Sequence, residues 1–516
     1  MDLDTPILQF TYEQQQTIWT LRDACQGTAV FGGLGSGKTS GSAKTLALKL
    51  LGLGMGGLIL TAKIEERNLW EEYARIARRS NDLIIVEPGG KYRFDLLAYL
   101  LEESIKASNS TDNIVEILTN VIQASADKSS GKSDDPFWEN ALHMLIYNTI
   151  DLCKLAYSRL RIDDMYRLVQ SIPKGDNSLK EFNNYIAQRN SGKQDGDPNF
   201  FYETFILANR NKNEAVSKYK ENLGIKELAS LEADPNKEAT LSMYVPEHRL
   251  FTLLEEFFTK NYIDLSDKTR SIIDFSFSGF LFRLMREPNY SLFFNGTTNF
   301  VPEDSLKGKI ILIDLPVKKY YNAGRDCQTL FKLIWQKAME KRDLSCNQKP
   351  VFLFSDEAQF FLTPTDTDFL TTARSSMVAV VMISQNLPNY YANMGGQKAD
   401  HKVKSLLGVM GTIIFHSNTD VDTNRFASEL IGDCIYQEKS NSDSIGNQSF
   451  SSGTTKSYRY DRILRPEEFT QLRSGGTIHD HVVEAIIHIQ GSNSTNELGY
   501  SRIYFNQNYG TQTFKK

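Results

Sequence analysis

Cysteine is scarce in this sequence and forms no pattern. The five cysteines among 516 residues are scattered, and no two of them form a C-x-x-C pair; they are Cys25, Cys153, Cys327, Cys346 and Cys434. This distribution excludes a disulfide framework and a zinc site built from paired cysteines. A reducing compartment such as the cytosol is the simplest home for such a chain.

Long apolar runs and an excess of positive charge are also missing. The longest apolar-looking stretch, residues 50–62, is rich in glycine and shorter than the roughly 20 apolar residues that span a bilayer. The first residues contain neither the basic region nor the apolar segment of a signal peptide. We therefore expect a cytoplasmic chain without a membrane anchor of its own. The net charge of −5 excludes a strongly basic nucleic-acid coat but is compatible with a local basic pore.

The pattern of apolar runs and helical periods along the chain predicts an α/β domain that is interrupted by a helical segment. Residues 1–100 alternate short apolar runs with helical stretches, which is typical of a buried parallel sheet. Residues 101–300 have helical periodicity, as in 137–157, and contain 29 acidic against 23 basic residues. Residues 301–516 return to the α/β pattern. We expect the middle segment to be a mostly helical domain inserted into one α/β domain, and the Ser/Gly/Asn-rich stretch 440–457 to be a flexible surface loop.

A phosphate-binding loop is the strongest motif. The segment GGLGSGKT fits the pattern G-x-x-x-x-G-K-[ST] and lies between an apolar strand and a helix. Glycines let successive backbone N–H groups point at phosphate oxygens, and the following helix presents its positive end to the same anion. We expect Lys38 to reach the β- and γ-phosphates of ATP and Thr39 to ligate Mg²⁺. The predicted nucleotide-binding residues are Gly32, Gly33, Leu34, Gly35, Ser36, Gly37, Lys38, Thr39 and Ser40.

A pair of acidic residues supplies the second half of such a site. The apolar run VFLFS leads directly into Asp356 and Glu357. Asp356 at the end of a neighbouring parallel strand is placed to hold Mg²⁺, and Glu357 to act as general base for the attacking water. Taken alone, the pattern also fits a solvated strand end. Together with the phosphate-binding loop it predicts hydrolysis of ATP.

Three further polar residues fit a nucleotide site less firmly. Gln385 ends the strand that follows Asp356 in sequence, and it is predicted either to orient water or merely to cap the strand. Arg374 is a candidate arginine finger offered by a neighbouring subunit, or a solvated surface arginine. Lys63 could face nucleotide or DNA, although a surface lysine is the simpler interpretation. The cluster 479–481 (His-Asp-His) lacks a third metal ligand at a useful spacing and is predicted to be a turn.

The order of these motifs resembles that of the conjugative coupling ATPases of type IV secretion, within the FtsK/HerA group of DNA pumps. FGGLGSGKTSG is similar to the family's phosphate-binding loop. VFLFSDEAQFF, then ARSS, then VMISQN, resembles its acidic, arginine and glutamine series. KIILIDLPV and LRPEEFTQLRSGG resemble its re-entry strand and closing segment.

The resemblance implies a RecA-like motor domain with a parallel-rich sheet, an all-α domain and a homo-hexameric ring around DNA. It further implies a relaxase or secretion-system proteins as partners of the helical insert. Members of the family usually begin with transmembrane helices, so a separate membrane partner at the inner face of the membrane is expected here. A related DNA pump for packaging or defence is the nearest alternative.

Two classes of function remain open at this point. The first is an ATP-driven DNA translocase that hydrolyses ATP at the subunit interfaces of a ring. The second is a nucleotide-gated adaptor, whose acidic helical insert recruits a protein or a basic segment. Stimulation of ATP hydrolysis by DNA separates the two.

Overall fold

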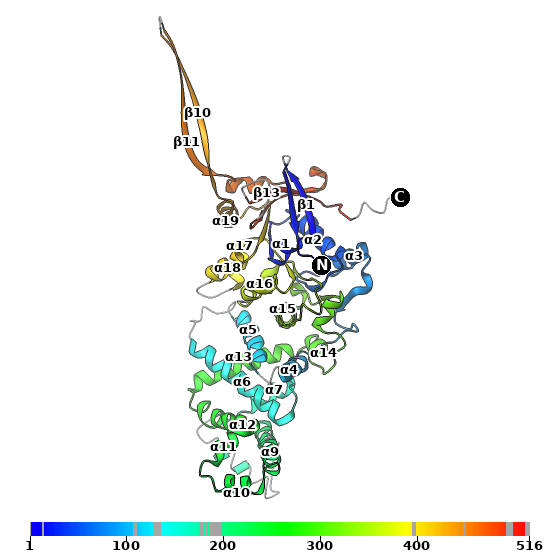
Figure 1. Cartoon of the computed structure of the whole chain (residues 1–516), viewed down its shortest axis with the longest axis vertical. Coiled ribbons are helices and arrows are strands. Elements are labelled where there is room, and N and C mark those ends of the chain that lie inside the picture. The colour runs from blue at the N-terminus through cyan, green and yellow to red at the C-terminus, as the bar shows by residue number, and fades with distance from the viewer. Residues whose placement is uncertain are drawn as a thin grey trace. The chain divides into compact units, whose positions relative to one another are not determined.

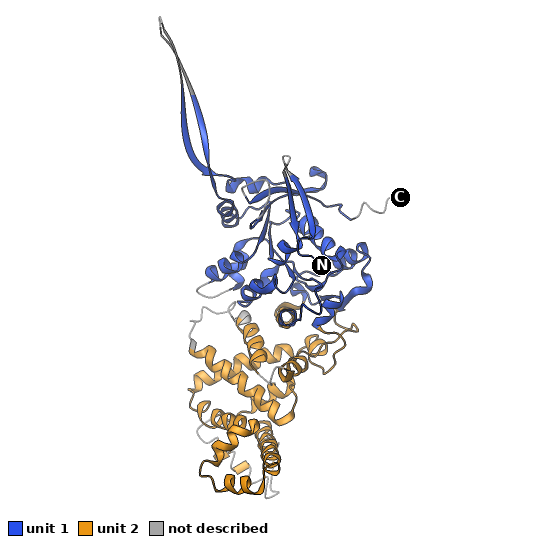
Figure 2. Ribbon diagram, viewed as in Figure 1, with its two compact units in different colours: residues 1–85, 302–319, 335–516 blue, residues 86–301, 320–334 orange. Residues whose placement is uncertain are grey.

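A computed structural model shows how the chain folds into two compact units, which are coloured separately in Figure 2. The structure describes all residues except 1, 13–14, 107–110, 127–135, 175–179, 182–183, 186, 188–198, 395–398, 447–448, 492–498 and 511–516. Unit 1 comprises residues 1–85, 302–319 and 335–516, and unit 2 comprises residues 86–301 and 320–334.

A nine-stranded, mostly parallel sheet forms the centre of unit 1. Its strand order is β13-β12-β9-β3-β8-β7-β4-β6-β5, so strands distant in sequence become neighbours. The pairs β3–β8, β3–β9, β7–β8, β4–β7 and β4–β6 are parallel, whereas β12 pairs antiparallel with both β9 and β13. The strand bounds are β3 Thr28–Phe31, β4 Gly56–Leu60, β5 Leu83–Val86, β6 Ile310–Ile313, β7 Val351–Ser355, β8 Val378–Ser384, β9 Thr412–His416, β12 Val482–Ile489 and β13 Tyr500–Asn506.

The central strands are short, continuous apolar runs because both faces of the sheet are covered. Every residue of β3, β4, β6, β7, β8 and β9 is buried. Such runs are typical of parallel strands packed between two layers of helices. On one side, Trp70 of α3 stacks on Phe352 with ring centroids 6.0 Å apart and meets Phe354 edge-on at 4.9 Å.

Helices and short turns connect these strands (Figure 1). The helices of unit 1 are α1 Leu21–Cys25, α2 Lys44–Gly52, α3 Glu66–Ile76, α16 Asp366–Ala373, α17 Leu387–Met394, α18 Ala399–Gly408 and α19 Val421–Ile431. A π-helical turn, η1 Thr39–Ala43, leads into α2. Shorter turns are η2 Ser80–Asp82, η4 Pro302–Lys307, η5 Ala358–Phe360, η6 Pro466–Gln471 and η7 Thr477–His479. Helix α15, Val317–Glu340, is interrupted at Tyr321 (φ 50°, ψ −134°), and its residues 320–334 belong to unit 2.

Two antiparallel hairpins of unit 1 were not predicted. The first, β1 Pro6–Tyr12 with β2 Gln15–Thr20, precedes α1. The second, β10 Asp433–Gly446 with β11 Ser449–Arg462, pairs without interruption from Asp433↔Arg462 to Gly446↔Ser449. The prediction of a flexible loop at 440–457 is therefore wrong. Serine and glycine content suggested a loop, but the adjacent Thr454 and Thr455 and the alternating Tyr458 and Tyr460 of the second arm favour a strand.

Unit 2 is built from helices. They are α4 Leu96–Lys106, α5 Asp112–Ala126, α6 Pro136–Tyr157, α7 Ile162–Ser171, α9 Phe200–Glu221, α10 Ile225–Ala233, α11 Lys237–Tyr244, α12 Pro246–Glu256, η3 Phe257–Asn261, α13 Asp267–Leu284 and α14 Asn289–Phe293. Its core is rich in aromatic rings, such as Phe205 against Phe251 at 4.9 Å and Phe201 against Phe258 at 5.1 Å. Across the described residues, no helix is both long and apolar enough to cross a bilayer.

Candidate active site

The site lies at the carboxyl edge of the parallel strands of unit 1. Phe31 pairs with Ser384, Ser355 with Met382, and Leu60 with Ser355. Because these strands run in the same direction and end at nearly the same level, the residues after each strand meet at one edge. This register brings the phosphate-binding loop, the acidic pair and Gln385 together, as expected for ligand sites of open α/β sheets.

The phosphate-binding loop has a backbone that only glycine accommodates well. Gly35 and Gly37 adopt φ angles of 71° and 80°. A Cβ atom on Gly37 would lie 2.5 Å from Val483 Cγ2 and 2.8 Å from the carbonyl oxygen of Ser474. One on Gly32 would lie 2.5 Å from Ser36 Oγ. The turn is therefore fixed both by its dihedral angles and by its close packing.

A cavity of about 380 Å³ opens above this loop. Its lining comprises Gly35, Ser36, Gly37, Lys38, Thr39, Ser40, Lys44, Leu69, Glu72, Tyr73, Ser474 and Gln507. Among the other predicted loop residues, Gly33 donates its N–H to Ser417 O at 2.8 Å, and the Leu34 side chain is 93% exposed. Ser40 Oγ accepts a hydrogen bond from Gln507 Nε2 at 2.6 Å. The cavity therefore combines the loop with side chains of α3 and of the C-terminal segment.

Lys38 is a buried cation within this loop. Its Nζ lies 3.5 Å from Gly33 O, a weak hydrogen bond. Burial lowers the pKa of the Lys38 ammonium, although the nearby charges of Asp356 and Glu357 partly offset this effect. A buried ammonium of this kind is stabilised by an anion, and phosphate oxygens are a suitable one.

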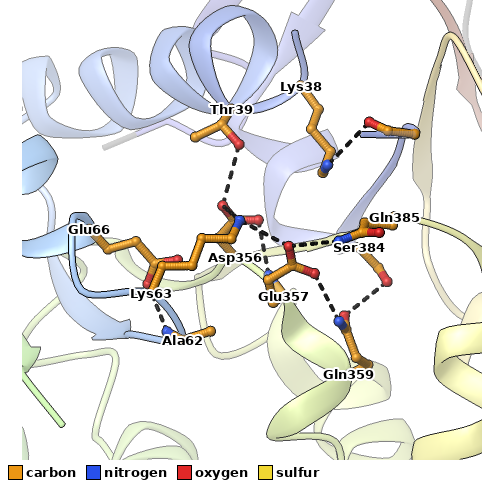
Figure 3. Close-up of polar contacts among 11 residues, drawn as sticks. Lys38, Thr39, Ala62, Lys63, Glu66, Asp356, Glu357, Gln359, Ser384 and Gln385 are labelled. Carbon is orange, nitrogen blue, oxygen red and sulfur yellow. Dashed lines mark hydrogen bonds and ion pairs between the residues drawn. The ribbon is translucent and has the colours of Figure 1, made fainter. Parts of the chain in front are cut away.

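Thr39 and Asp356 meet although 317 positions separate them in the chain. Thr39 Oγ1 donates a hydrogen bond to Asp356 Oδ2 at 3.3 Å, and Figure 3 marks this contact with a dashed line. Asp356 directly follows β7, and Thr39 is the first residue of η1. A hydroxyl beside a carboxylate is the oxygen donor set that Mg²⁺ takes in phosphate-binding loop proteins. The residues present therefore fit a magnesium ion.

Glu357 is held on both carboxylate oxygens (Figure 3). Oε1 lies 2.9 Å from Lys63 Nζ and accepts a hydrogen bond from Gln385 Nε2 at 3.2 Å. Oε2 accepts from Gln359 Nε2 at 2.8 Å. Burial on its own raises the pKa of Glu357, but the contacts with Gln359 and Lys63 outweigh it and leave the pKa below its usual value. Glu357 is therefore ionised at neutral pH, and the alternative of a solvated strand end is wrong.

Lys63 belongs to this cluster, so its interpretation as a surface lysine is wrong. Its Nζ lies 3.2 Å from Asp356 Oδ2 and 2.9 Å from Glu357 Oε1. Burial disfavours the charged form, but the charge of Asp356 and the contact with Glu357 raise the pKa of Lys63 above its usual range. One cation thus bridges the two acidic residues. Its place just after β4, at the same edge of the sheet, is the signal that could have identified it.

Arg374 lies away from this cluster. It is exposed and sits in the turn between α16 and β8, where Met377 N donates to its carbonyl at 3.1 Å. This turn is at the amino edge of the sheet, whereas Gln385 follows the carboxyl end of β8. Seven residues of strand, about 23 Å, separate the two edges. Within one chain, Arg374 is therefore not brought to the site.

Sequence reasoning missed two side chains that support the cluster. Gln359 donates to Glu357 and accepts a hydrogen bond from Ser384 Oγ at 2.9 Å. Its spacing of two residues from Glu357 is the available signal. Glu66 Oε2 accepts from Ala62 N at 2.8 Å, and burial, followed by the charge of Asp356, raises the pKa of Glu66. No sequence pattern marks this second residue.

The cluster at 479–481 is a turn, as predicted. η7 ends at His479, and the next two residues, Asp480 and His481, have φ angles of 51° and 58° before β12 begins. His479 Nδ1 contacts Gly475 O at 3.1 Å. These residues shape the entry into β12 and lie apart from the acidic pair in sequence.

Comparison with known proteins supports the resemblance. Residues 350–474 match a protein family described as the TraM recognition site of TraD and TraG. No curated protein sequence matches the chain. The unbound form of the bacterial conjugative coupling protein TrwBdeltaN70 aligns with 96% of this chain and 87% of its own, at 12% identity and a TM-score of 0.55.

Two nucleotide complexes of the plasmid coupling protein TrwB also align. The complex with the GTP analogue GDPNP covers 97% of this chain and 95% of its own, at 12% identity and a TM-score of 0.48. The complex with ADP and Mg²⁺ covers 97% and 94%, at 12% identity and 0.46. The alignment with TrwBdeltaN70 shows that the fold of this chain, an α/β domain with a helical domain, resembles that of a conjugative coupling protein. Residues 350–474 in addition match the family described as the TraM recognition site of TraD and TraG.

Proposed function

We propose that this protein is an ATP-driven DNA translocase of the coupling type. The observation that carries the proposal is the meeting of Thr39, Asp356 and Glu357 at one edge of the sheet. Binding of a nucleotide alone would need only the loop. A buried, ionised carboxylate beside the magnesium-type donor pair is instead suited to hydrolysis.

Each residue of the cluster takes one role in this proposal. The loop N–H groups and the Lys38 ammonium bind the β- and γ-phosphates of ATP. Thr39 and Asp356 would hold Mg²⁺, whose chemistry is to neutralise charge on the phosphate oxygens. Lys63, Gln359 and Gln385 orient the Glu357 carboxylate through the contacts described above.

Glu357 is the general base for the attacking water. The water oxygen bonds to the γ-phosphorus while the bond from that phosphorus to the β,γ-bridging oxygen breaks. The proton of the water passes to the Glu357 carboxylate, and ADP leaves with the electron pair of the broken bond. Because the Glu357 pKa is depressed, the carboxylate is free to accept this proton at neutral pH.

The ring and its cargo complete the proposal. A homo-hexamer would place the exposed Arg374 of one subunit at the nucleotide of the next, since Arg374 does not reach the site of its own chain. DNA would pass through the ring and be gripped at its backbone. The fold of the coupling proteins and the family match at 350–474 support a role with a relaxase or secretion proteins as partners, and with a separate membrane partner.

Two measurements on the full chain separate a pump from a nucleotide-gated adaptor. Steady-state ATP hydrolysis is measured with and without DNA, and ATP-dependent displacement of streptavidin from biotinylated DNA is followed in parallel. A translocase shows stimulation by DNA and displacement that needs ATP. Hydrolysis that ignores DNA, with no displacement, would instead support the adaptor.

A further inference from the structure

The hairpin β10–β11 has two faces of different chemistry. Side chains alternate between faces along each strand, and paired residues share a face. Ile435 pairs with Tyr460, Gln437 with Tyr458, and Lys439 with Lys456, so these six residues form one face, here called the tyrosine–lysine face. Tyr436 pairs with Arg459, and Glu438 with Ser457, on the opposite face. The hairpin extends from unit 1 at the upper left of Figure 1.

On the opposite face, positive and negative side chains pair with each other. Arg459 lies 3.9 Å from Glu438 and 3.8 Å from Asp461. The tyrosine–lysine face has no such balance, because none of its six residues is acidic. Its lysines pair directly across the two strands, which places their Cβ atoms about 5 Å apart and is unfavourable for like charges. An anionic ligand bound at the two lysines would offset their mutual repulsion and make the pairing of these lysines favourable.

The aromatic residues of the same face are open. Tyr458 is 71% exposed, Tyr460 76% and Ile435 55%. Tyr458 OH accepts a hydrogen bond from Gln437 Nε2 at 3.1 Å. This contact restrains the Tyr458 ring through its hydroxyl group and leaves the flat side of the ring accessible. A two-stranded ribbon is at best marginally stable in water without a partner. The face therefore offers flat rings beside two cations.

We propose that the tyrosine–lysine face binds single-stranded DNA, and this inference rests on the proposed function. Lys439 and Lys456 contact backbone phosphates, while Tyr458 and Tyr460 stack on unpaired bases. Positive groups that follow the backbone and aromatic rings that stack on bases are the two elements of single-strand recognition. Successive rows of the face lie about 7 Å apart, so the phosphate contacts and the stacking platforms are side by side.

A membrane surface fits the same residues less well. The lysine pair lies farther along the ribbon than Tyr458 and Tyr460, on the side away from its base at Asp433 and Arg462. Seven further residue pairs, from Ser440↔Thr455 to Gly446↔Ser449, separate the lysines from the far end of the ribbon. A bilayer approached by that end would therefore meet neither the lysines nor the tyrosines first. Duplex DNA fits less well too, because its bases are already stacked.

The test measures binding of the full chain to fluorescently labelled oligodeoxythymidine by anisotropy over a series of salt concentrations. The double variant Tyr458→Ala/Tyr460→Ala should weaken affinity by about tenfold or more for each ring, with the salt dependence retained. Lys439→Gln/Lys456→Gln should reduce the slope of log K against log salt by about 1.4, because two phosphate contacts are lost. Tyr436→Ala and Arg459→Gln, on the opposite face, are matched controls and should bind as the native chain does.

Three outcomes would overturn the proposal. The first is native affinity and slope in both tyrosine–lysine variants. The second is a preference for duplex DNA that these variants do not change. The third is loss of binding to vesicles containing anionic phosphatidylglycerol while oligonucleotide binding stays intact, which would identify a membrane surface. Basal ATP hydrolysis should be unchanged in every variant. Failure of the proposed function would show instead as absent hydrolysis in the native chain.

Discussion

Glu357 shows most directly how the site constrains single residues. Its backbone has φ 50° and ψ 46°, the left-handed region that non-glycine residues seldom adopt. Such a conformation costs roughly 1 kcal/mol and persists where the surroundings impose it. Here Lys63, Gln359 and Gln385 hold the side chain on both oxygens. Strain at a carboxylate held in this way is consistent with a catalytic role.

Lys63 gives the first prediction at this scale. Lys63→Met keeps most of the side-chain length and removes the cation that bridges Asp356 and Glu357. Two neighbouring carboxylates then lack their shared counter-ion, and Glu357 loses one of its orienting contacts. We expect ATP hydrolysis to fall by about 10- to 100-fold, a typical effect of losing an orienting partner. Binding of a fluorescent ATP analogue should change far less.

A matched control for this variant is Lys404→Met. Lys404 is exposed on α18 and pairs only loosely with Asp400, at 4.0 Å. It should hydrolyse ATP at the native rate. Native hydrolysis by Lys63→Met would contradict the role of Lys63 in positioning the Glu357 carboxylate. Lys63 would then be a surface cation that takes no part in hydrolysis.

At the scale of the elements, the central sheet of unit 1 could be predicted from the sequence better than the two hairpins. Strands such as β8 are nearly continuous apolar runs, and this pattern is typical of buried parallel strands, so their existence could be predicted. The hairpin β10–β11 was missed, because its arms are rich in serine and glycine, and this composition outweighed the alternating tyrosines at Tyr458 and Tyr460. The position of Lys63 just after β4 was visible in the sequence, but its contacts with Asp356 and Glu357 were not, because the pairing of β4 with β7 is not encoded in any one segment.

Gly37 gives the prediction for the phosphate-binding loop as an element. Gly37→Ala places a methyl group 2.5 Å from Val483 Cγ2 and 2.8 Å from the Ser474 carbonyl, and backbone cannot yield as a side chain can. Overpacking of this kind costs about 1–3 kcal/mol beyond the cost of the left-handed backbone. We expect a lower free energy of unfolding in urea titrations and weaker nucleotide binding.

Gly54→Ala is the matched control, because Gly54 also has a positive φ, 75°, but open space at its Cβ. It should lower the free energy of unfolding by only about 1 kcal/mol, the cost of the left-handed conformation itself. Equal losses in the two variants would show that the contacts with Val483 and Ser474 are not what restricts Gly37.

At the scale of the whole molecule, the long stretch of sequence between the two halves of the site is what indicates that the α/β domain is interrupted. Residues after Thr39 and before Asp356 include all of unit 2, which takes in residues 86–301 and 320–334. The second piece of unit 2 could not be predicted, because 320–334 lies within the bounds of α15, where the helical backbone breaks at Tyr321 (φ 50°, ψ −134°) and no sequence pattern marks the break. Assembly beyond one chain is likewise not visible in a sequence, and it needs its own test.

Arg374 provides that test. If it acts on the nucleotide of the next subunit, Arg374→Ala binds ATP as the native chain does but hydrolyses it about 10³- to 10⁵-fold more slowly. Mixing inactive Lys38→Ala with inactive Arg374→Ala protein should restore part of the activity, since some interfaces then join an intact loop to an intact arginine. No recovery despite demonstrated subunit exchange would place Arg374 on the surface and remove this reason for a ring.

The central claim is that Glu357 activates water while Asp356 and Thr39 serve the metal. The most direct measurement is single-turnover hydrolysis of ATP by the full chain and by Glu357→Gln, with ATP binding determined on the same samples. The variant keeps the side-chain shape and the metal-type pair, so it should bind ATP with native affinity. Its hydrolysis should be about 10²- to 10⁴-fold slower, the usual effect of removing a general base. Native hydrolysis by Glu357→Gln would contradict the account.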